Sequence, residues 1–381
     1  MTTSRPPTAH RKKPSAVLPR QVVLVLQGGG ALGSYQAGVY QAMQEAGMEP
    51  DWVIGTSIGA INAALIAGNP PDRRMEHLRT FWHGLEQPVC KGLSVWGNGT
   101  LNTALSDWIT MAAGIPSFFV PNPLAWLGQH ARVGVERAAY YTTEPLRQTL
   151  SRLVDMDYIN ARHVRMALGA VKIATGEMHY FDSRKETLTL DAILASGALP
   201  PAFPAVRVDN DFYWDGGIYS NTPVEAVLDD HPRRSSLIFT VDLWSAKGRV
   251  PESLWEVEGK QKDIRYASRS ESHIAQQQKL HHLRHVIESL IAAMPGSLRE
   301  RPDVVELAGR GCHTTMHIAR IIAPHAADED PLMDIDFVPR NIRTRWQAGY
   351  RDAQAMIECA PWNDPVDPLQ GIVVHDALGT M

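Results

Sequence analysis

The pentapeptide at residues 55–59, Gly-Thr-Ser-Ile-Gly, has the residue types and the spacing of a nucleophilic serine motif. A short apolar run, Trp52 to Ile54, precedes it, and small residues at helical spacing follow it. This order predicts a strand, a sharp turn and a helix, a setting that exposes the hydroxyl of Ser57 at the carboxyl edge of a sheet. Gly55 and Gly59 lack the Cβ atoms that would collide with neighbouring atoms in so tight a turn. The pattern therefore predicts covalent catalysis in which Ser57 attacks an acyl group.

A glycine-rich turn precedes the serine and contains Gly28, Gly29, Gly30 and Gly33. Its spacing also matches the fingerprint of dinucleotide-binding folds, which needs an acidic residue at the end of the second strand to hold the ribose. Asp51 precedes that strand instead, so the sequence argues against a bound cofactor. Successive backbone N–H groups at such a turn, just before a helix, can bind an anion. Opposite an exposed serine they would form an oxyanion hole for acyl transfer.

The third requirement of acyl transfer is a base within hydrogen-bond reach of the nucleophile. The chain has 15 histidines, but none lies in a strand-end or glycine-flanked setting that recommends it as the base. Asp215 ends the short strand-like run 211–214, and Gly216 and Gly217 follow it. Asp-Gly-Gly alone is more often a simple turn, but after two upstream glycine motifs it indicates the base. We expect burial in a lipid-binding pocket to raise the pKa of Asp215 from about 4 toward the working pH.

In this order and at this separation, the three motifs resemble those of a patatin-like phospholipase domain. The resemblance extends over residues 21–243 and includes the block Ala195 to Pro200, between the serine and the aspartate. It implies a three-layer α/β/α fold with a central, mostly parallel sheet, and hydrolysis of acyl esters in lipids. Carried over by motif, Ser57 is the nucleophile and Asp215 the base of a dyad without histidine, and the backbone of residues 28–30 supplies the oxyanion donors. No cofactor and no metal are expected.

The chain departs from the family pattern just after the triple glycine. An arginine or lysine often follows there in the family, whereas Ala31 and Leu32 follow here. The departure puts in doubt any contact from that position to an oxyanion or a phosphate group.

The elements that position these motifs alternate between strands and helices. Residues 22–26 form a continuous apolar run, which is typical of a parallel strand buried on both faces. A helix is expected from Tyr35 to Ala46, and the next strand leads into Ser57, so the order is β-α-β-α. We expect an acyl hydrolase domain over residues 21–245. A largely helical C-terminal extension over residues 246–381 should follow, with one strand at 318–323, a helix near 340–357 and a loose tail over the last twenty residues.

Two segments lack regular periodicity. Residues 1–20 are polar and basic, and we expect them to form a disordered tail. Residues 90–139 contain aromatic side chains scattered among glycines, prolines and asparagines, and Phe118 and Phe119 are among them. Such a segment is either a cap over an apolar pocket or a separate small core, and the sequence leaves both alternatives open.

Two further patterns compete with the serine site. His281 and His285 have a spacing that can bind a metal on one helical face, but no acidic or cysteine partner has matching spacing. We therefore expect a solvated helix face at these two residues and the intervening His282. A second cluster of basic and aromatic residues favours ordinary ion pairs over phosphate binding, and it comprises Arg340, Arg343, Arg345 and Trp346.

Composition restricts the setting and the partners. The net charge of −4 gives no attraction toward nucleic acid, and the three cysteines are far apart, which is typical of a reducing compartment. No secretory signal is evident, and no apolar run reaches the roughly twenty residues that a membrane-spanning helix needs. We expect a cytoplasmic protein with a lipid or ester substrate and peripheral contact with membranes. The oligomeric state stays open.

Two alternatives to lipid hydrolysis stay open at this point. One is a soluble esterase or thioesterase, including one that acts on hydroxyacid oligomers. The other is a catalytically silent scaffold that binds lipid with the same fold. Loss of ester hydrolysis on changing Ser57 would separate an enzyme from a scaffold.

Overall fold

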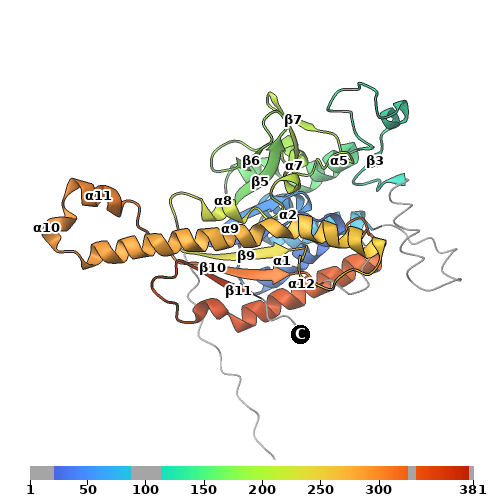
Figure 1. Ribbon diagram of the computed structural model, residues 1–381. Helices are drawn as coiled ribbons and strands as arrows, with labels where there is room; N and C mark the ends of the chain where they lie inside the picture. The colour runs from blue at the N-terminus through green and yellow to red at the C-terminus, as the bar shows by residue number, and fades with distance from the viewer. Residues whose placement is uncertain (1–20, 87–112, 325–331, 377–381) are drawn as a thin grey trace, which may run out of the picture.

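The computed structural model describes residues 21–86, 113–324 and 332–376. Within these ranges the chain forms a nine-stranded sheet with helices on both faces (Figure 1). The expected tail at residues 1–20 lies outside the described residues, and so do residues 90–112 of the aromatic segment. The strands of the sheet are β1 Val22–Leu26, β2 Trp52–Thr56, β5 Arg165–Lys172, β6 Glu177–Asp182, β7 Val206–Val208, β8 Asp211–Asp215, β9 Ser236–Asp242, β10 Met316–Ile322 and β11 Ile372–Asp376.

The helices lie between and after these strands, and a small ribbon of two strands, β3 (Val120–Pro121) and β4 (Tyr141–Thr142), stands apart from the sheet. The α-helices are α1 Ser34–Glu45, α2 Ile58–Ala67, α3 Pro71–Gly84, α5 Glu144–Leu153, α6 Met156–Asn160, α7 Leu190–Ser196, α8 Val224–Leu228, α9 Leu254–Ala293, α10 Gly296–Arg299, α11 Pro302–Ala308 and α12 Pro339–Cys359. The 3-10 helices are η1 Gly30–Gly33, η2 Pro123–Leu127, η3 Gly216–Ile218 and η4 Pro361–Asn363.

Six neighbouring strands of the sheet run parallel, in the order β11-β10-β9-β1-β2-β5. Strands β6 and β8 pair with β5 in the antiparallel direction, and β7 pairs with β8 in the same way. The prediction of a mostly parallel sheet is therefore confirmed. Leu26 pairs with Gly55 and with Val241, so β1, β2 and β9 end at the same edge of the sheet. The glycine-rich turn and the serine turn both leave from that edge.

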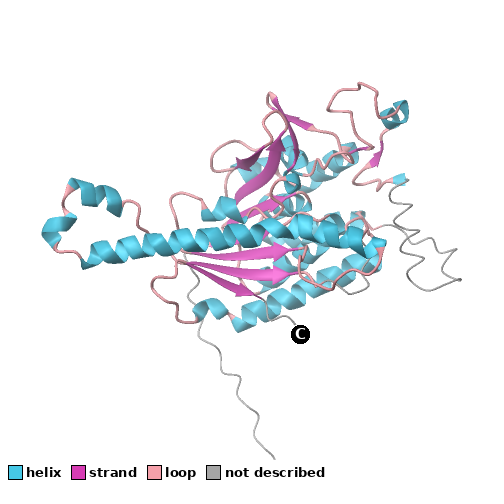
Figure 2. Cartoon of the chain, in the orientation of Figure 1, coloured by secondary structure: helices cyan, strands magenta, loops and turns pink. Residues whose placement is uncertain are grey.

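Alternation of side chains along the strands explains the three layers, because successive residues of a strand point to opposite faces. Leu24 and Leu26 pack in the larger core cluster, on the face covered by α1, α2, α3 and α12. Val23 and Val25 pack in the smaller cluster with Val224 of α8 and Ile274 of α9 on the other face. Figure 2 shows the sheet between these two layers of helices. The predicted three-layer α/β/α fold is confirmed.

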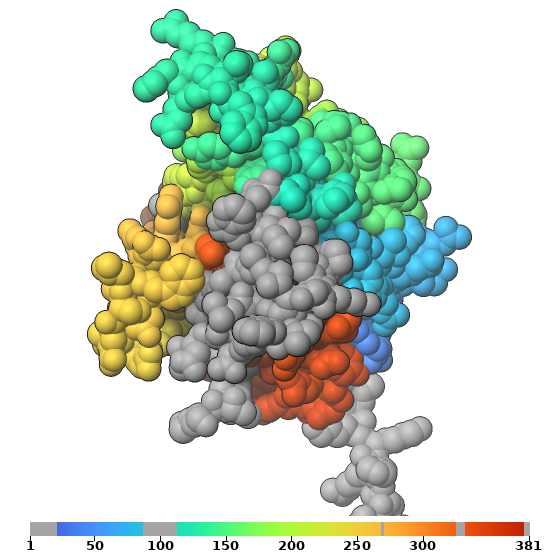
Figure 3. Space-filling view, turned by 90° about the vertical axis from the view of Figure 1, so that its right-hand side faces the viewer, coloured from blue at the N-terminus to red at the C-terminus, as the bar shows by residue number. Residues whose placement is uncertain are grey.

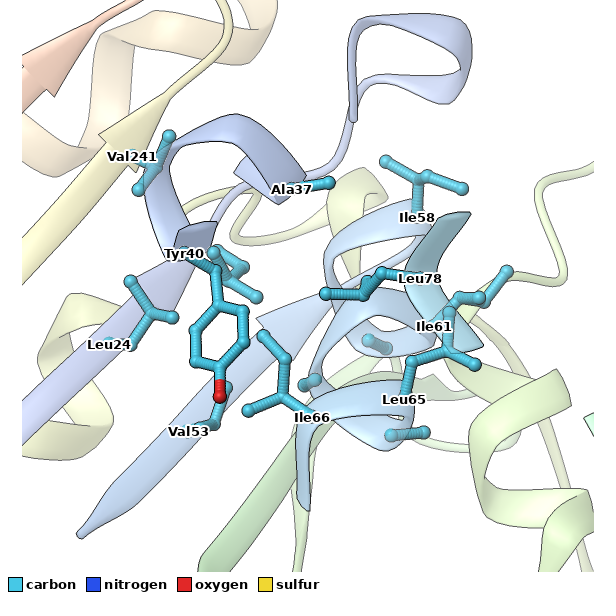
Figure 4. Close-up of a cluster of buried hydrophobic side chains, with 14 of the residues drawn as sticks. Leu24, Ala37, Tyr40, Val53, Ile58, Ile61, Leu65, Ile66, Leu78 and Val241 are labelled. Atoms are coloured by element: carbon cyan, nitrogen blue, oxygen red, sulfur yellow. The ribbon is translucent and has the colours of Figure 1, made fainter. Parts of the chain in front are cut away.

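The larger core cluster joins the first strands to the helices that follow them. Figure 4 shows Leu24 and Val53 of the sheet facing Tyr40 of α1 and Ile66 of α2. All four side chains are almost completely buried. Because α2 begins directly after Ser57, burial of its apolar residues holds the serine turn against the sheet.

The region after residue 245 is helical, as expected, but it also completes the sheet. The strand predicted at 318–323 is β10, and it pairs with β9 along its whole length. Helix α12 crosses α1 so closely that a Cβ atom on Gly38 would lie 1.9 Å from the carbonyl oxygen of Trp346. The expected loose tail is wrong for residues 372–376, because they form β11 and bury Ile372 against β10. Pairing with a distant strand, which local sequence does not reveal, creates this element.

Candidate active site

Ser57 occupies the sharp turn between β2 and α2, as the motif predicted. Its backbone angles, φ 57° and ψ −127°, are unusual for a residue with a side chain, and such strain is concentrated at functional sites. A Cβ atom on Gly55 would lie 2.2 Å from the carbonyl oxygen of Gly59, and one on Gly59 would lie 2.2 Å from that of Leu26. The N–H of Ser57 donates to the carbonyl oxygen of Ser196 at 3.0 Å. The two glycines therefore permit a turn that the rest of the fold holds in place.

Asp215 ends β8, and its side chain is buried beside Ser57, with 1% of the residue exposed. One carboxylate oxygen accepts a hydrogen bond from the N–H of Gly217 at 2.7 Å. Burial raises the pKa of Asp215 from 3.8 to about 7, while the nearby Ser57 hydroxyl and the N–H of Gly217 oppose that rise. The expected upward shift of the pKa is confirmed. A carboxylate with a pKa near neutrality can accept a proton from a hydroxyl group far more readily than an exposed aspartate can.

The glycine-rich turn lies against both residues. A Cβ atom on Gly28 would lie 3.0 Å from the Cβ of Ser57, so the turn approaches the serine closely. The N–H of Gly28 donates to the carbonyl oxygen of Asn221 at 3.2 Å, so of residues 28–30 this one already has an acceptor within the protein. The N–H groups of Gly29 and Gly30 have no acceptor among the described residues, and Gly30 begins η1. These two donors are available to a ligand.

The conformation of Gly30 explains why the third glycine is needed. Its φ angle is +54°, and a Cβ atom there would lie 2.2 Å from the carbonyl oxygen of Asp334. That oxygen accepts a hydrogen bond from the N–H of Ala31 at 2.7 Å. The other predicted glycines support the site by close packing: Gly33 contacts Ile58, Gly216 lies against Gly169, and Gly217 lies beside Asn221 and Asp215.

Three side chains that the motifs did not indicate hold the glycine-rich turn. The side-chain amide of Asn221 donates to the carbonyl oxygen of Gly28 at 3.0 Å, and the indole N–H of Trp244 donates to the same oxygen at 2.8 Å. The side-chain oxygen of Gln27 accepts the N–H of Trp244 at 2.9 Å. Asn221 follows Asp215 by six residues, and this proximity to the Asp-Gly-Gly motif is the only sequence signal that could have indicated one of the three.

The block at residues 195–200 contacts both Ser57 and Asp215. The hydroxyl of Ser196 donates to the carbonyl oxygen of Gly169 at 2.6 Å, and its backbone oxygen accepts the N–H of Ser57. Two residues further on, the carbonyl oxygen of Ala198 accepts the N–H of Asp215 at 3.0 Å. The spacing between Ser57 and Asp215 is therefore fixed by a third segment that contacts both.

Ser57 and Asp215 line a cavity of about 170 Å³ with mostly apolar walls. Phe118 and Phe119 form part of the wall, pack against Phe203, and belong to the larger core cluster. The described part of the segment 90–139 thus contributes to the cavity and to the main core together. No histidine is among the described residues that line the cavity. Its apolar lining comprises Ile58, Ile61, Phe118, Phe119, Tyr141, Leu146, Leu199, Ala202, Phe203, Trp244, Tyr266, Ile335 and Phe337.

The competing patterns lie elsewhere. The expectation of a solvated face at the histidines of α9 is wrong for His281 and His285, which are buried, while His282 is exposed. His285 contacts the carbonyl oxygens of Pro368 and Thr314, in loops that the sequence does not place near α9. Among the described residues, no group of three histidine, cysteine or acidic side chains could hold a metal ion.

The basic cluster on α12 forms ion pairs, as expected. Arg345 pairs with the buried Asp336 at 3.3 Å, and Arg343 approaches Glu86 at 3.8 Å. The indole of Trp346 donates to the side-chain oxygen of Gln41 at 2.8 Å. Separately, none of the helices in the described ranges has the length and apolarity that crossing a bilayer requires.

Comparison with known families gives two matches along the chain. A family model described as patatin-like phospholipase matches residues 24–228, and a second, described as patatin phospholipase, matches residues 264–369. The second match covers most of the region that the first leaves out. Both descriptions name patatin and a phospholipase, although the two matches cover different parts of the chain.

Curated relatives match over short segments. Lysophospholipase nte1 of Aspergillus terreus is 58% identical over 48 residues, which are 13% of this chain and 3% of that protein. The patatin-like phospholipase domain-containing protein ZK370.4 of Caenorhabditis elegans is 44% identical over 59 residues, 16% of this chain and 4% of that protein. The matched segments thus span only a few per cent of these relatives' own lengths.

Solved structures with a similar arrangement have low sequence identity. VipD from Legionella pneumophila is 16% identical with a TM-score of 0.39, over 94% of this chain and 72% of that one. The type III effector protein ExoU is 14% identical with a TM-score of 0.32, over 90% of this chain and 53% of that one.

Proposed function

The chain belongs to the patatin-like phospholipase family, and from that membership we propose that it is a serine hydrolase that cleaves carboxylic esters of lipids. The observation that carries the proposal is the buried carboxylate of Asp215 beside the hydroxyl of Ser57, at an apolar cavity. In this proposal Ser57 is the nucleophile and Asp215 is the general base.

The proposed reaction begins with transfer of the Ser57 proton to Asp215 as the serine oxygen attacks the ester carbonyl carbon. The carbonyl oxygen becomes negatively charged and accepts hydrogen bonds from the N–H groups of Gly29 and Gly30. Each such donor can lower the barrier by about 3 kcal/mol. Asp215 then returns its proton to the leaving alcohol. In the second half-reaction Asp215 takes a proton from water as the water oxygen attacks the acyl carbonyl carbon. Asp215 then gives this proton to the Ser57 oxygen as the bond to the acyl group breaks, which releases the fatty acid and restores Ser57.

The cavity and the relatives support a lipid as the substrate. The walls near Ser57 are aromatic and aliphatic side chains, which suit an acyl chain better than a polar group. The curated relatives include proteins named lysophospholipases. We therefore propose glycerophospholipid or lysophospholipid esters as the substrate class, with a cytoplasmic location as expected from the sequence.

Exposed apolar residues on one side of the molecule support peripheral contact with a lipid surface. Trp126 and Leu127 of η2 are 90% and 64% exposed, and Leu254 at the start of α9 is 85% exposed. Figure 3 shows the segment that contains η2 (teal) and the start of α9 (yellow) on the same face, toward which the parallel strands point in Figure 1. Tryptophan at such a position suits the boundary between water and lipid. We propose that this face meets the substrate membrane.

A panel of esters presented to the purified protein tests the proposed function. We expect fatty acid release from lysophospholipid and diacyl phospholipid, and slower hydrolysis of short p-nitrophenyl esters, because only a long acyl chain fills the apolar cavity. Mass spectrometry of the released acids measures the reaction. Turnover of short soluble esters or hydroxyacid oligomers alone would favour the soluble esterase alternative. No turnover of any ester would favour a lipid-binding scaffold.

Phe119→Ser should impair long-chain substrates more than short ones. The ring lines the cavity, and each methylene that loses an apolar contact weakens binding by about 0.8 kcal/mol, so we expect about a tenfold larger loss of kcat/KM on a long-chain ester. Phe118→Ser should behave in the same way. Both rings also belong to the core, so the melting temperature should fall.

Phe81→Ser is the matched control for this prediction, because Phe81 is buried in the same core cluster but is not part of the cavity lining. It should lower the melting temperature and affect long and short esters equally. If Phe119→Ser also reduced both substrates equally, its ring would serve only the core.

A further inference from the structure

Two arginines stand out among those with buried or half-buried side chains. In the described residues, six such arginines are ion-paired with a carboxylate, namely Arg74, Arg147, Arg165, Arg184, Arg320 and Arg345. Arg233 and Arg284 are half-buried and have no carboxylate partner in the described part of the chain. A half-buried guanidinium without a counter-charge is unfavourable, because burial removes hydration that nothing replaces. In the other six arginines, a paired carboxylate supplies the counter-charge.

The two unpaired arginines are neighbours in space. Arg233 lies in the loop between α8 and β9, and Arg284 lies on α9, which packs along α8 (Figure 1). Burial lowers the pKa of Arg284, and the positive charge of Arg233 lowers it further. A buried nitrogen on each side chain, Nε of Arg233 and Nη1 of Arg284, has no hydrogen-bond partner. The fold therefore brings two like charges together and leaves donors of both unused.

His281 lies one helical turn before Arg284 and completes the basic cluster. The residue is fully buried, and neither ring nitrogen has a well-aligned hydrogen-bond partner, although the carbonyl group of Leu228 is close. Burial, followed by the charges of Arg284 and Arg233, lowers the pKa of His281 to about 4. At neutral pH the ring is therefore uncharged and can donate one N–H.

One carboxylate lies near the cluster without forming an ion pair with it, and its single charge is smaller than that of the two guanidinium groups together. Asp229 is close enough for its charge to act on Arg284, but one of its carboxylate oxygens accepts a hydrogen bond from the side-chain amide of Gln277 at 2.6 Å. The ring of His285 contacts two carbonyl oxygens. Cys312 also lies near Arg284, and its sulfur contacts the hydroxyl of Thr314 at 2.9 Å. The two guanidinium groups and the neutral imidazole therefore still have N–H groups that could donate hydrogen bonds to a ligand.

We propose that Arg233, His281 and Arg284 bind an anion of the phosphate class, in a site separate from the one that contains Ser57. Guanidinium groups suit phosphate because their N–H donors match its oxygens in pairs. The site lies at the opposite edge of the sheet from the serine. Helix α8 begins just after Asn221, which contacts the glycine-rich turn, and the chain reaches Arg233 only beyond its far end. The bound phosphate is either a free or soluble phosphate compound or a lipid headgroup.

Melting temperatures in sodium phosphate and in sodium chloride of equal ionic strength test the site without reference to ester hydrolysis. Phosphate that binds the folded protein should raise the melting temperature of the wild type by about 5 °C at concentrations well above the dissociation constant. Arg233→Gln and Arg284→Gln should remove that increase. In chloride, both variants should be at least as stable as the wild type, because the repulsion between the two arginines is gone. Arg234→Gln, at an exposed neighbour, should behave like the wild type.

The comparison between variants separates binding from general effects of the salt, since phosphate excluded from the protein surface stabilises every variant equally. An equal increase in all four proteins would overturn the site. So would a lower melting temperature of both glutamine variants in chloride, which would show a purely structural role for the arginines.

Further ligands distinguish the two sources of the phosphate. If glycerol 3-phosphate raises the melting temperature only when both arginines are present, the ligand is a soluble phosphate compound. If the protein sediments with phosphatidic acid vesicles only when both arginines are present, and soluble phosphate does not raise its melting temperature, the ligand is a lipid headgroup. If neither probe depends on the two arginines, the proposed site is wrong.

Discussion

Ser57→Ala is expected to abolish ester hydrolysis, with less than about a hundredth of the wild-type turnover left, because loss of a nucleophile removes the covalent route. The fold should survive the change. The N–H of Ser57 still donates to Ser196, and the alanine Cβ occupies the place of the serine Cβ. Hydrolysis of a p-nitrophenyl ester and the melting temperature measure the two expectations. A fluorophosphonate probe should label the wild type at Ser57 and leave the alanine variant unlabelled.

Ser183→Ala is the control, because Ser183 is a buried serine just after β6 and is not part of the cavity lining. It loses a hydrogen bond to the N–H of Met166 and should lower stability slightly while keeping full turnover. Labelling of another serine in the Ser57→Ala protein, or residual activity above about a hundredth, would contradict the assignment of the nucleophile.

The serine, glycine and aspartate motifs of the candidate site could be predicted from the sequence because each is local. The serine turn needs small residues at 55 and 59, where a Cβ atom would collide with backbone oxygens. The residues that meet such a requirement are only a few positions apart, so a short sequence pattern reveals them. The family and the three-layer fold followed from three such patterns in a fixed order, and both are confirmed.

The parts that could not be predicted depend on contacts between distant segments. Trp244 and Asp334 bind the glycine-rich turn although they lie more than 200 residues after it. Strand β11 exists because β10 pairs with it. His281 and His285 have the spacing of a helix face, but only the packing of α9 against α8 and two loops decides that this face is buried. Periodicity identifies a face of a helix; it does not say what covers that face.

Asp215→Asn is expected to reduce kcat/KM by about 10²-fold or more, because the amide keeps the shape of the carboxylate but cannot accept the serine proton. The N–H of Gly217 can still donate to the side-chain oxygen, so the turn should stay intact. Asp211→Asn is the matched control, since Asp211 begins the same strand and pairs with Lys172 away from the cavity. It should retain nearly full activity. If a single histidine substitution abolished turnover while Asp215→Asn stayed active, the dyad would be wrong.

The same variant should change the dependence of stability on pH. The pKa of Asp215 is higher in the folded protein, about 7, than its ordinary value of 3.8. The folded state therefore binds more protons than the unfolded chain between these values, and it loses stability as the pH rises through them. Asparagine removes this loss, so at pH 8 the variant should melt at the same temperature as the wild type or higher. A lower melting temperature would attribute part of the lost activity to unfolding.

The pH profile of kcat/KM separates a base from a residue that only shapes the site. Only the ionised form of Asp215 can accept a proton, so wild-type kcat/KM should be constant above about pH 7 and fall about tenfold for each unit below it. The small residual activity of Asp215→Asn should lack this decrease, because its side chain does not titrate. The Asp211→Asn control should keep the wild-type profile. A decrease that persisted unchanged in Asp215→Asn would assign the titrating base to another group.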